Sequence, residues 1–109
     1  MKVSELASLL QFKVLTDNKS MDREISGVYI CDLLSWVMSH ANKGDAWITV
    51  HTHINVVAVA VLAEIPCIIV PEGINVEEST IYKANEEGIA ILSSDKTAYQ
   101  IAVEISKIL

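Results

Sequence analysis

Two histidines separated by one residue, His51 and His53, are the side chains of this sequence best suited to chemistry. They follow an alternating apolar run at residues 46–50 and precede an apolar segment that begins at Asn55. Two imidazoles at this spacing at the end of a strand can ligate a metal ion, or they can hydrogen-bond to an anionic or nucleotide-like ligand. A third interpretation is a pair of loop histidines without a ligand. No obvious carboxylate or cysteine cluster completes a set of three or four metal ligands, which counts against the metal.

The turn at residues 71–73 (PEG) is a second candidate, because it follows the next apolar run along the chain, at 67–70. Gly73 would let backbone N–H groups face a ligand, and a helix capped by Asn75 would direct its positive end to the same place. Glu72 would repel a phosphate. A tight turn that needs glycine for its backbone angles explains the same residues without a ligand.

The hydrophobic pattern predicts the scaffold that would position these residues, because short apolar runs alternate with segments of helical periodicity. Residue types that favour helix N-caps stand before the helical segments: Ser4, Asp32, Asn75 and either Ser94 or Asp95. The predicted helices are 5–10, 33–41, 55–63, 76–87 and 96–109, and the predicted strands are 12–15, 25–31, 46–50, 67–70 and 89–92. The valine-rich composition of residues 55–63 also suits a strand, and we assign them to a helix because 67–70 is the better strand.

Strands separated by helices of about ten residues imply crossover connections and a parallel sheet. The predicted fold class is α/β: one domain over residues 1–109 with three α/β/α layers, a mostly parallel sheet of about five strands and helices on both faces. Because the carboxyl ends of parallel strands meet at one edge of the sheet, residues 51–55 and 71–73 should lie side by side there. The predicted ligand-binding set is His51, Thr52, His53, Asn55 and Gly73.

Composition narrows the classes of partner. The chain has 109 residues, of which 51% are hydrophobic and 20% charged, so it can bury a core and is not disordered. Its formal net charge of −6 makes nucleic acid and anionic membranes poor partners. Cys31 and Cys67 lie in apolar runs, which indicates two buried thiols in a reducing compartment. No apolar segment is long enough to span a membrane. We therefore expect a cytoplasmic protein without a cofactor.

Apolar residues in excess of what a small core can hold predict a contact between copies. Trp36 points away from the apolar stripe of its predicted helix, which consists of Leu33, Leu34, Val37, Met38 and Ala41. The helix at 55–63 is apolar on all sides, and a domain of this size can rarely bury every side of a helix. We therefore expect a homodimer, with Trp36, Val56 and Val59 at the interface.

The order of several short motifs resembles the DRTGG domain, which is similar to the N-terminal domain of HPr kinase/phosphorylase. The motifs are DREISG at 22–27, YICDLLS at 29–35, GDAWIT at 44–49, THIN at 52–55 with Ala58, and EGIAILS at 87–93. The chain departs from the family pattern in having PEG at 71–73, where many members have Thr-Gly-Gly, and HIN at 53–55, where others have Asp-Arg. The resemblance implies a regulatory or accessory module of enzymes such as CBS-domain pyrophosphatases, without catalytic activity of its own.

The predicted function is a non-catalytic regulatory module, homodimeric and sensing a small nucleotide or anion. No nucleophile elbow, P-loop or zinc-protease motif is present in the sequence. Stand-alone copies of the domain resemble small proteins found with iron-only hydrogenase systems, which implies an enzyme partner. The alternative is therefore a metal-binding or enzymatic accessory protein that uses His51 and His53, with His40 as a further candidate ligand.

Overall fold

One five-stranded sheet runs through the middle of the molecule. The computed structural model describes the backbone of residues 1–109 and every side chain except that of Asn18. The strands are β1 (Lys13–Val14), β2 (Gly27–Ile30), β3 (Asp45–Ile48), β4 (Cys67–Val70) and β5 (Ala90–Ser93). Their order is β1-β5-β4-β3-β2, in which β2 to β5 are parallel and β1 is antiparallel to β5. The predicted mostly parallel sheet is confirmed.

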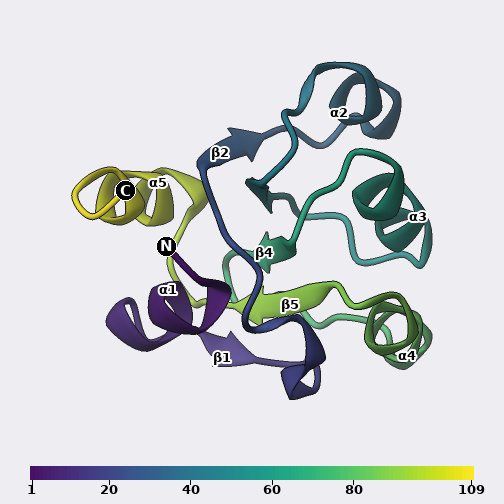
Figure 1. Ribbon diagram of the computed structural model, residues 1–109, viewed down its shortest axis with the longest axis horizontal. Helices are drawn as coiled ribbons and strands as arrows, with labels where there is room; N and C mark the ends of the chain where they lie inside the picture. The colour runs from purple at the N-terminus through teal and green to yellow at the C-terminus, as the bar shows by residue number, and fades with distance from the viewer.

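Helices cover both faces of this sheet. They are α1 (Val3–Leu9), α2 (Leu34–His40), α3 (Asn55–Leu62), α4 (Glu78–Glu87) and α5 (Ala98–Ser106), with a short 3₁₀ turn, η1 (Asn18–Ser20). Figure 1 shows α2, α3 and α4 on one side of the strands and α1 and α5 on the other, which confirms the three predicted layers. Within the part of the chain described, no helix is both long and apolar enough to cross a bilayer.

The strands bury side chains on both faces, as parallel strands between two helix layers must. Trp47, Ile68 and Ile91 point toward α2, α3 and α4 and belong to the core on that side. Ile48 and Ile69 point to the opposite face, where they pack with residues of α1 and α5. Every residue of β3 and β4 is buried, which explains why the apolar runs in the sequence located these strands well.

Four predicted helix starts are wrong, each for a physical reason. The first helix begins at Val3 with Lys2 as its N-cap in place of Ser4, and the Glu5 side chain accepts a hydrogen bond from the Lys2 N–H. The second helix begins at Leu34 because the carboxylate of Asp32 is engaged by the neighbouring strand instead of capping. The fourth begins at Glu78, after an extended segment in which Ile74 and Val76 pack against the core. The last has Thr97 as its N-cap; its side chain accepts from the Gln100 N–H, and the Gln100 side chain accepts from the Thr97 N–H.

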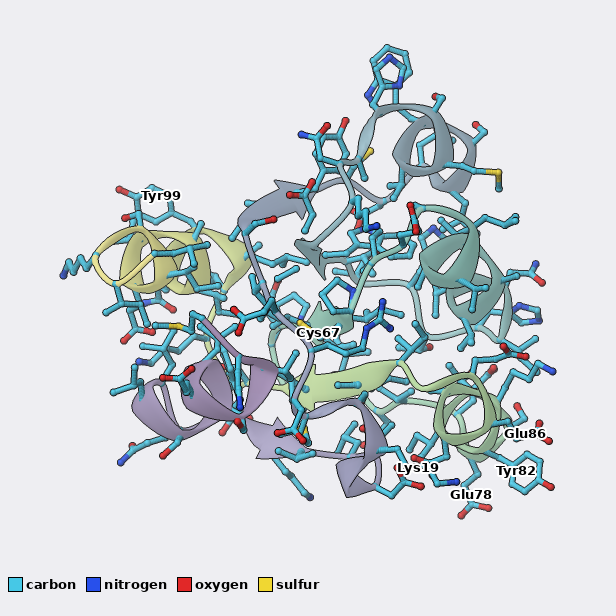
Figure 2. All side chains as sticks on the ribbon, in the orientation of Figure 1. Lys19, Cys67, Glu78, Tyr82, Glu86 and Tyr99 are labelled. Atoms are coloured by element: carbon cyan, nitrogen blue, oxygen red, sulfur yellow. The ribbon has the colours of Figure 1, made fainter. Side chains whose placement is uncertain are left out.

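Cys67 lies in the interior of the sheet, on β4 (Figure 2). Burial raises the pKa of its thiol from 9.0 to about 12, against a smaller opposing effect of the Arg23 charge. Between these values the unfolded chain releases a proton that the folded chain retains, so the unfolded state binds fewer protons and stability falls as pH rises.

We therefore expect the ionisation of Cys67 to lower the free energy of unfolding by about 1.4 kcal/mol for each pH unit above about pH 9. Urea unfolding of the wild type and of Cys67→Val, between about pH 9 and pH 11, measures this contribution. Lysines and tyrosines titrate in both proteins, so the difference between the two slopes isolates Cys67. Equal slopes would contradict the prediction.

Candidate functional site

The carboxyl ends of β2, β3, β4 and β5 meet at one edge of the sheet, called here the carboxyl edge. Because β3 and β4 are parallel neighbours, residues 51–55 and 71–73 both follow strands at this edge, as predicted. The antiparallel strand β1 brings its first residue, Lys13, to the same edge, where it pairs with Ser93 of β5. In open parallel sheets this is the edge at which ligands bind.

Two hollows open here, on either side of Lys13, Ser93 and Asp95. The first, called the β4–β5 hollow, has a volume of about 250 Å³ and is otherwise lined by Leu15, Gly73, Ile74, Asn75, Val76 and Ile81. The second has a volume of about 280 Å³ and is otherwise lined by Leu10, Gln11, Ser94 and Lys96. The two hollows therefore share one ammonium, one hydroxyl and one carboxylate, groups that can orient a small polar ligand.

Gly73 contributes to the β4–β5 hollow by having no side chain. Its backbone has φ +63°, and a Cβ on it would lie 2.9 Å from Oδ1 of Asp95. The Gly73 N–H donates to the carbonyl of Ser94 at 2.9 Å, and the Glu72 N–H donates to the carbonyl of Lys96 at 2.9 Å. Both N–H groups thus already have acceptors, and the turn is joined to the segment that leads into α5.

The two loop histidines lie apart from the hollows. His51 and His53 are exposed, and neither lines either hollow. The Nδ1 of His53 accepts a hydrogen bond from the backbone N–H of Asn55 at 3.2 Å, at the start of α3. The carbonyl of Thr52 accepts from the Thr80 hydroxyl at 2.7 Å, which ties this loop to α4. Of the predicted ligand-binding residues, only Gly73 lines a hollow.

The structure does not bring the three histidines together. His40 ends α2 and stacks on Trp36, with ring centroids 3.8 Å apart and an interplanar angle of 9°. Since α2 runs back from the carboxyl edge, His40 lies toward the opposite edge from His51 and His53. Among the residues that the structure describes, no three His, Cys, Asp or Glu side chains are placed to hold a metal ion.

Asp32 and Thr49 link the ends of β2 and β3. Oδ1 of Asp32 accepts from the hydroxyl of Thr49 at 2.9 Å and from the Val50 N–H at 3.0 Å. The same Thr49 oxygen accepts from the His51 N–H at 3.2 Å. This network holds the start of the histidine loop against the end of the outermost parallel strand, so these polar groups have a structural use.

The predicted interface residues differ in exposure. Trp36 is 49% exposed, in agreement with its predicted position away from the core. Val56 and Val59 are 1% and 4% exposed, so they lie in the core and have no surface with which to contact a partner. The outer side of α3 is formed by Ala58, Val61 and Leu62 instead. On α2, Leu33 and Met38 were expected in the buried stripe but are exposed, and of that stripe only Val37 is fully buried.

Sequence reasoning missed Lys13, and it left Ser93 and Asp95 out of the predicted ligand-binding set, because helix capping was the preferred explanation of the polar residues after the last predicted strand. Their position directly after a predicted strand was the available signal for the latter two, because such positions lie at the carboxyl edge. Nothing local marks Lys13. Its place depends on the antiparallel pairing of β1 with β5, which joins segments from opposite ends of the chain.

A solved structure shares this fold. The chain superposes on part of the crystal structure of the CBS and DRTGG domains from the regulatory region of a Clostridium perfringens pyrophosphatase, which was solved in complex with its activator diadenosine tetraphosphate. The TM-score is 0.76 at 13% identity, over 94% of this chain and 44% of that chain. The chain therefore spans less than half of that relative, and at this identity the likeness establishes the fold alone.

No curated protein matches the chain in sequence. The model of one family does, and it is the family that the motifs at 22–35, 44–58 and 87–93 resemble. The match to the DRTGG domain extends over residues 5–108, nearly the whole sequence, and the chain belongs to the DRTGG domain family.

Proposed function

We propose that the chain is a non-catalytic, homodimeric regulatory module that binds a small nucleotide or anion at the carboxyl edge of its sheet. The observation that carries this proposal is the β4–β5 hollow, a concave polar site of about 250 Å³ at the edge where parallel sheets bind ligands. Lys13 supplies the positive charge, Ser93 and Asn75 supply hydrogen-bond donors, and the carboxylate of Asp95 supplies an acceptor for a hydroxyl or amino group of a nucleotide.

Two further observations support a regulatory function without catalysis. The polar groups of the histidine loop are engaged in holding the backbone: Thr49 with Asp32, His53 with Asn55, and Thr52 with Thr80. The fold is that of a domain from the regulatory region of a pyrophosphatase, a protein whose structure contains an activating dinucleotide. A module of this kind changes the activity of an enzyme when it binds its ligand, and it catalyses no reaction itself.

Calorimetric titration with AMP, ATP, diadenosine tetraphosphate and inorganic phosphate tests the proposal. At least one of these is expected to bind, and Lys13→Ala should weaken its binding about tenfold or more, because a charge-assisted hydrogen bond is worth about 1.5–3 kcal/mol. Lys107→Ala is the matched control, since Lys107 is exposed at the far end of α5 and should leave the affinity unchanged.

The double variant His51→Ala/His53→Ala separates the two candidate sites at this edge. It should bind as the wild type does, because neither histidine lines a hollow. If the double variant loses binding and Lys13→Ala does not, the ligand is held by the histidine loop and the β4–β5 hollow is not the site. If none of the four compounds binds at millimolar concentration, the ligand part of the proposal is wrong.

A further inference from the structure

The strand β2 ends the sheet on the side opposite β1, and its outer edge faces away from the protein (Figure 1). The Thr49 N–H donates to the carbonyl of Ile69, so odd-numbered residues of β3 direct their backbone groups toward β4 and even-numbered ones toward β2. In the parallel register of Gly27 with Asp45, this turns the backbone of Gly27 and Tyr29 toward β3. The N–H and C=O groups of Val28 and Ile30 are consequently directed outward.

This edge lacks the features with which proteins protect exposed strands. Edge strands are usually guarded by lysines, prolines or bulges that prevent pairing with another chain. Between residues 25 and 42 the only Asp, Glu, Lys or Arg is Asp32, and its carboxylate is bound by Thr49 and Val50. The other outer strand, β1, has only two residues, of which one is Lys13.

An apolar surface lies beside the unprotected strand. Ile30 is 51% exposed at the end of β2, Leu33 is 61% exposed just before α2, and Trp36 is 49% exposed on α2. The indole of Trp36 is held in place by the stacked ring of His40, so this surface is preorganised. Large aromatic residues with few charges around them are typical of the centre of protein interfaces.

We propose that β2 pairs in antiparallel orientation with β2 of a second copy, so that the two sheets join into one of ten strands. A second copy matches this surface in charge: although each chain carries a net charge of −6, the surface itself is nearly free of charged side chains, so two copies can meet here without placing like charges against each other. The geometry is also self-complementary, as a two-fold interface requires. This inference deepens the homodimer part of the proposed function and is independent of the ligand site.

The register follows from the direction of the backbone groups. With Tyr29 facing its own copy across the two-fold axis, Val28 of each chain lies opposite Ile30 of the other. These two residues have the outward N–H and C=O groups, so each pair exchanges two hydrogen bonds. Leu33, just before α2, and Trp36 on α2 follow the carboxyl end of β2 in each copy and extend the apolar contact beyond the paired strands.

Light scattering of the wild type and two variants tests this interface. The wild type at micromolar concentration should have twice the chain mass of 12.0 kDa. Ile30→Lys places a charge at the seam and should give a folded monomer, with at least a tenfold weaker association. Leu62→Lys is the matched control, because Leu62 is an exposed apolar residue of α3, 68% accessible and away from β2; it should remain a dimer.

Amide hydrogen exchange gives a second readout that does not depend on a variant. The N–H groups of Val28 and Ile30 should be protected in the dimer and lose protection on dilution, whereas that of Tyr29, bonded to β3, should be protected in both states. A monomeric wild type would overturn both the homodimer and this interface. A dimer that survives Ile30→Lys, with unprotected Val28 and Ile30 amides, would leave the homodimer standing and overturn this interface alone.

Discussion

Replacing Trp47 by alanine should lower the free energy of unfolding by about 3–5 kcal/mol, the usual cost of removing a large buried aromatic side chain. Trp47 is fully buried on β3, in the core between the sheet and α2, α3 and α4. Its indole N–H also donates to the carbonyl of Cys31 at 2.8 Å, just beyond the end of β2. The substitution therefore leaves a cavity and an unpaired carbonyl together. Urea denaturation followed by circular dichroism measures the loss.

Trp47→Phe is the control that separates these two contributions. It keeps most of the apolar volume and removes the indole N–H, so it should cost about 1–3 kcal/mol, clearly less than alanine. If phenylalanine and alanine destabilise the protein equally, the hydrogen bond to Cys31 carries the effect and the packing account is wrong. If neither variant destabilises it, Trp47 is not in the core.

Replacing Asp32 by alanine should cost about 1–3 kcal/mol, because it removes the acceptor of both the Thr49 hydroxyl and the Val50 N–H. Thr49 is only 1% exposed, so its hydroxyl cannot turn to bulk solvent for a new partner. Asp32→Asn retains an oxygen acceptor and should recover most of the loss. Thermal unfolding of the two variants and the wild type is the measurement.

A result in which Asp32→Ala is as stable as the wild type would contradict the role given to this side chain. The variant should also show faster amide exchange at Val50 and His51 than Asp32→Asn does, since those amides lie on or beside the lost acceptor. A loss of stability without this local change would place the cause elsewhere.

The core strands could be predicted from sequence because their patterns are local. Cys67–Val70 is a continuous apolar run, and burial on both faces of a parallel strand requires this. The helix at Asn55–Leu62 was harder to predict, because valine favours strands, and only the better strand at 67–70 decided it. Val56, Val57, Val59 and Ala60 of this helix are buried, and most of its exposed residues are apolar as well. The hydrophobic pattern therefore could not indicate which side of the helix faces solvent.

The candidate site was predicted only in part because its members are joined by tertiary contacts. The edge of the sheet and Gly73 followed from topology and turn chemistry. Lys13 did not, because its place depends on a two-residue antiparallel strand that carries almost no pattern of its own. Asp32 has the residue type of an N-cap, and nothing local indicates that its carboxylate reaches Thr49 on the next strand.

The most direct test of the central claim is an NMR titration of the isotope-labelled protein with AMP and with inorganic phosphate. We expect amide shifts to concentrate at residues that line the β4–β5 hollow, above all Lys13, Gly73, Asn75, Ser93 and Asp95. Lys13→Ala should abolish these shifts, and Lys107→Ala should leave them unchanged. Shifts confined to residues 51–55, or no shifts with these two compounds or with ATP and diadenosine tetraphosphate, would contradict the claim that this hollow is the regulatory ligand site.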